Sequence, residues 1–168
     1  MTSAPASPLA PKPASDATAE MIQIVLPNDA NVHNSLLGGT VMHWMDLAAA
    51  VAAHRHARRP VVTVHVDSIT FEAPIKIGQL AILKARVTYV ATTSIEVAVQ
   101  VWSEDLNGGV RRHTSTAYFT FVAIDEHGRP TPVAPLRLDT DEERDEYRRA
   151  EARRQRRLAL RAGGERAG

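Results

Sequence analysis

Two hydrophobic patterns alternate along this chain of 168 residues and predict its elements. Residues 40–53, Thr-Val-Met-His-Trp-Met-Asp-Leu-Ala-Ala-Ala-Val-Ala-Ala, are apolar on nearly every face of a helix. They predict one long helix over 40–56, which Arg58-Arg59-Pro60 ends. Elsewhere apolar and polar positions alternate with a period of two, which is typical of half-buried strands. Such strands are predicted over 21–26, 61–71, 79–90, 94–103 and 111–123.

The order of these elements, one strand, a long helix and then four strands in a meander, indicates an α+β fold. Asn107-Gly108-Gly109 between the last two strands is typical of a hairpin. A meander needs one apolar face covered, and the helix is the only predicted element able to cover it. We therefore expect a curved antiparallel sheet wrapped around one central helix. A helix that is apolar all round is itself expected to be buried.

Composition divides the chain into three parts. Residues 1–18 are rich in Pro, Ala and Ser and predict a disordered N-terminal arm. Residues 19–138 carry the periodic pattern and are the expected folded domain. Residues 139–168 are a charged C-terminal helix or tail in which acids lead and arginines follow, an order that suits the helix dipole. We expect this tail to be a solvated, partly frayed helix; a basic face for nucleic acid or a partner is the alternative.

Composition also narrows the function classes. The chain has no cysteine, which excludes disulfides and cysteine metal sites. Its formal net charge of +1 indicates no strong electrostatic preference for a partner. The sequence lacks a run of about 18 apolar residues and a secretory signal pattern. We therefore expect a cytoplasmic protein without a membrane partner. Its seven histidines show no spacing typical of a ligand cluster, so no metal is expected.

One acidic residue interrupts the apolar helix. Asp46 lies in its second turn, and an unpaired carboxylate in a dry interior is costly, so it is either satisfied by a partner or kept for chemistry. Gly38 and Gly39 open the helix, where unpaired backbone N–H groups carry partial positive charge and suit an oxyanion. Asn31, in the loop before the helix, has both a donor and an acceptor, although it could instead shape a turn.

Several short segments follow one another in a recognisable order: 27–31 (PNDAN), 37–40 (LGGT), 44–49 (WMDLAA), 66–71 (VDSITF), 74–78 (PIKIG), 93–94 (TS) and 119–125 (FTFVAID). Together they resemble the hotdog-fold acyl-CoA thioesterases, most of all the brain-type long-chain acyl-CoA hydrolases and their small bacterial relatives. The resemblance covers roughly residues 20–136. It implies hydrolysis of acyl-CoA to free CoA and a carboxylic acid. It also implies an active pair, Asn31 and Asp46, contributed by opposite subunits, with Asp46 as general base or nucleophile.

The resemblance has further implications for ligands and assembly. The backbone N–H of Gly39 would be the oxyanion donor, with Gly38 and Thr40 beside it in the substrate site. Thr93 and Ser94 would contact CoA, with Ser94 as a phosphate contact from the start of a strand; a turn residue is the alternative for Ser94. No cofactor is implied, because CoA is part of the substrate. Two protomers would pair their sheets edge to edge in a homodimer that assembles further into a hexamer, and nucleic acid is not expected as a partner.

Two other functions stay open on the sequence. Asp29-Ala30-Asn31-Val32-His33 superficially resembles the Asp-x-Asn-Pro-x-His motif of hotdog enoyl-CoA hydratases, but the proline is absent and the histidine is one residue early. A non-catalytic acyl-CoA sensor could use the same fold, with its arginine-rich tail on DNA. No helix-turn-helix pattern accompanies the domain, and a sensor would not need the Asn31 and Asp46 pair. A sensor would bind acyl-CoA without releasing thiol.

Overall fold

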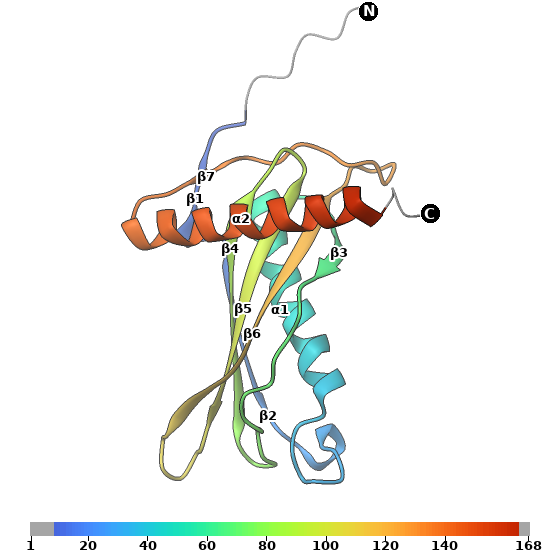
Figure 1. The fold of residues 1–168 in the computed structure, drawn as a ribbon. Helices are drawn as coiled ribbons and strands as arrows, with labels where there is room; N and C mark the ends of the chain where they lie inside the picture. Colours follow the sequence, from blue (N-terminus) through green and yellow to red (C-terminus); the bar gives the residue numbers. More distant parts are fainter. Residues whose placement is uncertain (1–8, 165–168) are drawn as a thin grey trace, which may run out of the picture.

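A five-stranded antiparallel sheet curves around one long helix in the computed structural model, which describes residues 9–164 (Figure 1). This arrangement confirms the α+β hotdog architecture that the sequence predicts. The main elements are the helix α1, Gly38–Ala57, and the strands β2, Thr18–Ile24, β3, Val61–Val66, β4, Leu80–Val90, β5, Ser94–Glu104, and β6, Arg111–Ala123. The remaining elements are β1, Lys12–Pro13, 3-10 turns at Ala14–Asp16 and Pro27–Asp29, β7, Leu136–Arg137, and a second helix, α2, Asp141–Gly164.

The strand order corrects the expected meander. The sheet runs β2-β4-β5-β6-β3, so only β4, β5 and β6 form a meander, and β3 lies at the far edge beside β6. This strand is also shorter than the predicted 61–71. Beyond Val66 only Asp67 and Glu72 donate backbone hydrogen bonds to β6, so residues 67–76 are a loop. The edge position leaves one side of β3 without a neighbouring strand among residues 9–164.

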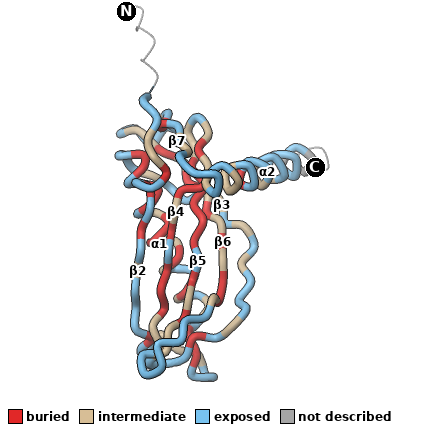
Figure 2. Tube along the Cα trace, turned by 90° about the vertical axis from the view of Figure 1, so that its left-hand side faces the viewer, coloured by how far each residue is buried: buried red, intermediate tan, exposed pale blue. Residues whose placement is uncertain are grey.

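The core lies between the sheet and one stripe of α1. Its alanines let the strands approach closely, and the buried stripe comprises Val41, Met45, Ala48, Ala49, Ala52 and Ala53. Figure 2 shows the matching buried positions along β4, β5 and β6. The expectation that α1 is buried all round is wrong for the protomer, because Met42, Leu47 and Val51 are 42–45% exposed on its other side. Asp46 is only half-buried and does not lie in a dry interior.

Part of the expected disordered arm is ordered. Strand β1 pairs in parallel with β7, and Ala14 and Ala17 are buried. The ammonium of Lys12 donates to the carbonyl oxygen of His56 at 2.7 Å. It thereby satisfies one of the carbonyl groups that the last turn of α1 leaves without a helical partner. Composition did not predict this ordered segment, because its alanines and Lys12 are held by contacts with residues distant in the sequence. Residues 1–8 lie outside the described part of the chain.

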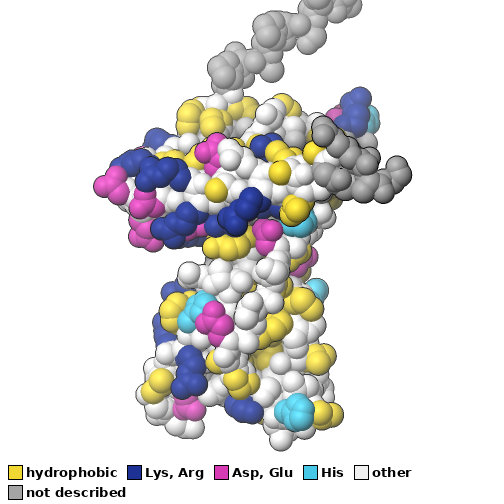
Figure 3. All heavy atoms as spheres, in the orientation of Figure 1, with side chains coloured by type: hydrophobic (Ala, Val, Ile, Leu, Met, Phe, Trp, Pro, Cys, Tyr) yellow, Lys and Arg dark blue, Asp and Glu magenta, His cyan; other side chains and the backbone are white. Residues whose placement is uncertain are grey.

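The helix α2 is packed against the sheet, which corrects the expected solvated tail. It crosses the strands near one end of the sheet, and charged side chains gather over its first turns (Figures 1 and 3). Thr140 and Glu143 form a reciprocal capping box, with Glu143 N to Thr140 Oγ1 and Thr140 N to Glu143 Oε2 both 3.1 Å. Ala150 is fully buried, and the ring of Tyr147 lies 4.6 Å from that of Tyr89. Among the described residues no helix is long and apolar enough to cross a membrane.

Candidate active site

Asp46 projects from α1 toward the edge strand β3. Its Oδ1 accepts a hydrogen bond of 2.8 Å from the hydroxyl of Thr63. Exposed apolar side chains lie along α1 and along the free strand β3 on either side of the pair; together we call them the edge surface, and they comprise Met42, Leu47, Val51, Val62, Val64 and Val66. Exposed apolar side chains gathered along an unpaired edge strand are typical of interaction surfaces. Thr63 was not among the predicted site residues, because a threonine in a β-strand carries no local motif.

Asn31 shapes a tight turn and keeps its amide nitrogen free. Its Oδ1 accepts from the backbone N–H of His33 at 2.9 Å and of Ser35 at 3.3 Å. These bonds fix the orientation of the amide, since only its oxygen can accept. Nδ2 has no acceptor within residues 9–164 and keeps two N–H donors for a ligand or another chain. Asn31 therefore shapes a turn, which is the alternative that the sequence left open. Its amide nitrogen is still available for a ligand or another chain.

The first turn of α1 supplies unpaired backbone donors. Val41 is the first residue to donate within the helix, to Leu37 O at 3.1 Å, so the N–H groups of Gly38, Gly39 and Thr40 have no helical acceptor. A Cβ added at Gly38 would lie 3.7 Å from the Phe71 ring, an ordinary contact. A Cβ added at Gly39 would meet nothing within 4 Å, so its backbone faces open space. This geometry suits the close approach of a carbonyl oxygen to the helix N-terminus.

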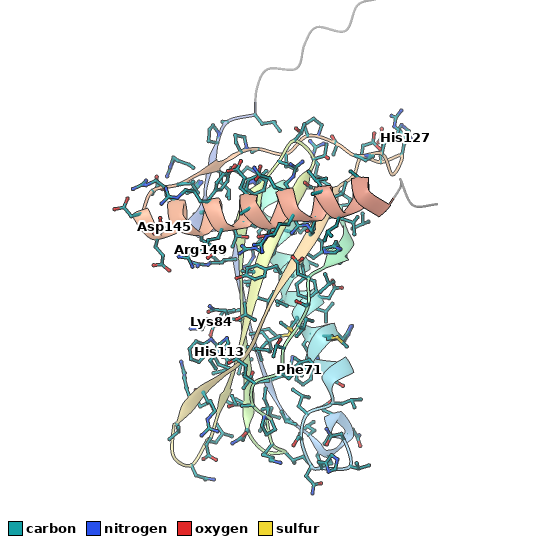
Figure 4. The ribbon with its side chains drawn as sticks, in the orientation of Figure 1. Phe71, Lys84, His113, His127, Asp145 and Arg149 are labelled. Atoms are coloured by element: carbon teal, nitrogen blue, oxygen red, sulfur yellow. The ribbon has the colours of Figure 1, made fainter. Side chains whose placement is uncertain are left out.

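A pocket of about 500 Å³ lies between the Asn31 turn, the start of α1 and the loop 67–76. Its lining includes Asn31, Gly38, Phe71 and Ser115, and Figure 4 shows Phe71 beside the lower half of α1. Asp46 is absent from the lining. It lies seven residues beyond Gly39, which is about 10 Å along a helix axis. Within one protomer the structure therefore brings Asn31 to Gly38 but not to Asp46.

The two residues expected to contact CoA have different surroundings. Ser94 lies at the start of β5 and lines a small pocket together with His65, Arg154 and Arg157. Thr93 contributes its backbone carbonyl to Ala123 N at 3.0 Å, and its side chain does not line that pocket. No group of three or more His, Asp or Glu side chains within residues 9–164 is arranged to hold a metal ion.

Known proteins resemble this chain along most of its length. A family model described as the thioesterase superfamily matches residues 33–110. YkhA of Bacillus subtilis, an uncharacterized acyl-CoA thioester hydrolase, is 43% identical over 119 residues, which are 71% of this chain and 69% of YkhA. An acyl-CoA hydrolase from Staphylococcus aureus, solved with butyryl-CoA and CoA, is 35% identical with a TM-score of 0.85 and covers 93% of this chain and 95% of its own. An apo-hexameric acyl-CoA thioesterase is also 35% identical, with a TM-score of 0.88, covering 92% of this chain and 99% of its own.

The chain therefore belongs to the thioesterase superfamily and is a thioester hydrolase. The Staphylococcus aureus enzyme has also been solved with single alanine substitutions of an asparagine, an aspartate and a threonine. Its substituted asparagine and aspartate are 15 residues apart, as Asn31 and Asp46 are. Its aspartate and threonine are 17 apart, as Asp46 and Thr63 are. This spacing is a signal that would have drawn attention to Thr63.

Proposed function

We propose that this protein hydrolyses acyl-CoA thioesters at a site that two protomers share. One observation carries the proposal: each protomer presents two separate halves of a site. One half is the pocket with the free amide nitrogen of Asn31 and the unpaired N–H groups at the start of α1. The other is the Asp46 carboxylate at the edge surface. The substrates in the names of the relatives support the acyl-CoA assignment.

The chemistry assigns a role to each group. The thioester carbonyl oxygen accepts from the N–H of Gly39, which stabilises the negative charge that develops there. Asp46 removes a proton from a water that attacks the carbonyl carbon, or attacks it directly. In the water route a C–O bond forms, the C–S bond breaks, and the proton held by Asp46 passes to the departing CoA thiolate. Thr63 orients the carboxylate through its 2.8 Å hydrogen bond.

A dimer through β3 would complete the site. The free edge of this strand and the edge surface both need a partner, because an unpaired apolar edge is prone to association. A second copy paired along β3 would cover both and bring the Asn31 half of one subunit to the Asp46 half of the other. The similarity to a hexameric thioesterase supports further assembly into a hexamer. Location in the cytoplasm stays a prediction from the sequence.

The first test is Asp46→Asn, which is nearly isosteric but can neither attack nor accept a proton. We expect kcat to fall by about 100-fold or more, the usual range for an acid–base group, in an assay of free-thiol release from acyl-CoAs between acetyl and palmitoyl. Asp145→Asn on α2 is the matched control, because its carboxylate is exposed and remote from the site (Figure 4). Thiol release near the wild-type rate by Asp46→Asn would remove this residue from the mechanism.

The second test asks whether the site is shared. Asn31→Ala and Asp46→Asn protomers are each expected to be inactive. When the two variants are mixed under conditions that allow subunit exchange, the mixture should regain part of the wild-type activity, because a mixed dimer contains one site with both native residues. If exchange is demonstrated by mass spectrometry and no activity returns, the site lies within one chain.

The same assays address the alternatives. A sensor would bind acyl-CoA and release no thiol. In the segment that resembles the hydratase motif, the Oδ2 of Asp29 accepts from Leu26 N at 3.1 Å and caps the 3-10 turn, which is a structural role. Hydrolysis is therefore the reaction that the described groups support best.

A further inference from the structure

The loop 67–76 forms one wall of the pocket at the start of α1. Phe71 of this loop lines the pocket, and its ring lies next to Gly38. Both ends of the loop are anchored, because Asp67 N donates to β6 at 3.0 Å and Ile75 O accepts from the segment before α1 at 2.7 Å. Phe71 itself is 48% exposed. Its position therefore depends on how the middle of the loop is held.

Glu72 holds the middle of the loop. Of residues 68–74, Glu72 alone forms hydrogen bonds with other described residues. Its backbone N–H donates to Thr114 O at 2.8 Å, and its Oε2 lies 3.3 Å from Nδ1 of His113. Glu72 follows Phe71 directly in the chain, so a contact that fixes Glu72 also limits the movement of Phe71.

A bulge in β6 directs both groups that Glu72 contacts. The pairing of β5 with β6 shifts between Val101 and Trp102, and Thr114 has no partner on β5. The extra residue of a bulge is left unpaired in the ladder, so the carbonyl oxygen of Thr114 is free to accept from the N–H of Glu72. Bulges also re-aim neighbouring side chains and are common next to active sites, and His113 is such a neighbour here.

His113 is fixed on its other sides by the sheet. Its Nε2 lies 2.9 Å from the hydroxyl oxygen of Thr116, and its ring meets the Trp102 ring edge-on with centroids 5.1 Å apart. A carboxylate can only accept, so Nδ1 of His113 carries a hydrogen and donates to Glu72. In the neutral ring Nε2 then accepts from the hydroxyl of Thr116. The imidazole therefore joins the loop to a fixed position on the sheet.

We propose that Glu72 and His113 are positioning residues that keep Phe71 against the pocket, and that their contact sets how tightly the pocket holds the acyl group of the substrate. The assignment of an acyl group to this pocket rests on the proposed function. An aromatic ring that completes an apolar wall strengthens binding through the apolar area that it buries. The apolar lining comprises Leu36, Val41, Phe71, Ala73, Pro74 and Ile75.

The test measures KM and kcat for thiol release from the acyl-CoA, between acetyl and palmitoyl, that the wild type cleaves fastest. Glu72→Ala should raise KM about threefold to tenfold, the scale of one hydrogen bond. It should leave kcat within about twofold, because the lost contact affects the bound substrate and the transition state equally. Glu72→Gln keeps an acceptor for Nδ1–H and should restore the wild-type KM.

Glu126→Ala is the matched control. Glu126 lies 3.5 Å from His127 in a similar exposed pair, and Figure 4 shows His127 well away from His113 and Phe71. This variant should keep the wild-type KM. An equal KM for Glu72→Ala and the wild type would overturn the proposal, and so would an equal rise in Glu72→Ala and Glu126→Ala.

A double variant separates positioning from a general loss of structure. In the Phe71→Ala background, Glu72→Ala should raise KM no further, because the contact acts on the substrate through the Phe71 ring. An undiminished further rise would show that Glu72 acts by another route and would overturn the proposal. His113→Phe keeps a ring against Trp102 but lacks the donor, and it should change KM as Glu72→Ala does.

Hydrogen exchange of residues 67–76, followed by mass spectrometry, tests the contact without turnover. Exchange should be faster in Glu72→Ala than in the wild type and in Glu126→Ala, because the loop opens more often when one of its contacts is lost. Equal exchange in all three proteins would overturn the proposal even if KM changes. Absence of thiol release by the wild type would instead refute the proposed hydrolysis, and the exchange rates would still decide whether this contact holds the loop.

Discussion

Replacing Arg153 with methionine tests how α2 is held on the sheet. The Glu96 side chain is 1% exposed, and Arg153, 15% exposed, binds its Oε1 at 2.8 Å. Thr88 donates to the same oxygen at 3.0 Å, and the Arg153 guanidinium lies 3.6 Å from the centre of the Tyr118 ring. The variant keeps most of the aliphatic volume and leaves a buried carboxylate with one of its two arginines.

The expected loss of unfolding free energy is about 3.5–4 kcal/mol. Breaking a buried ion pair by removing one partner costs about 3–5 kcal/mol, and Arg157 still binds Glu96, which places the loss at the lower end. Loss of the cation–π contact adds about 0.5–1 kcal/mol. A second substitution, Glu96→Gln, should restore part of the stability of Arg153→Met because the buried charge is then removed.

Urea unfolding followed by circular dichroism at one fixed protein concentration measures these values, since an oligomer's stability depends on concentration. Arg148→Met is the control: this arginine is 70% exposed and pairs with Asp145 on the helix surface, and exposed pairs contribute about 0–1 kcal/mol. The reasoning is refuted if both variants lose the same amount, or if Glu96→Gln further destabilises Arg153→Met.

Two further predictions concern His56 in the last turn of α1 and the C-terminal helix α2. Burial lowers the pKa of His56 below its ordinary 6.5, against the opposing effect of its hydrogen bond to Ala134 O. The unfolded chain then binds more protons than the folded chain, so stability should decrease as pH falls from about 6.5 toward the folded pKa of His56. The urea midpoint should fall over this pH range for the wild type and for the control His127→Gln, and it should fall less for His56→Gln. A chain ending at residue 138 loses the arginines that bind Glu96 and Asp67. It should unfold at a lower urea concentration than the full chain, whereas an unchanged urea midpoint would support the solvated tail expected from the sequence.

The sequence determined the fold class and most residues of the candidate site. The helix over 40–56 and the alternation in β4, β5 and β6 are local periodicities, and one apolar helix beside a sheet has few ways to pack. Gly38, Gly39, Asn31 and Asp46 were singled out as candidates from the chemistry of their residue types and from the family resemblance. Such features can be recognised in the sequence without knowledge of long-range contacts.

Tertiary structure decided what depends on neighbours distant in the sequence. The position of β3 beside β6 follows from strand pairing, which the period of two does not specify. Thr63 contacts Asp46 only because the fold places β3 beside α1. The charged residues of α2 looked solvated because no local signal shows that Arg153 and Arg157 meet the buried Glu96, 57 and 61 residues earlier. Electrostatic pairing across such separations arises only when the chain folds.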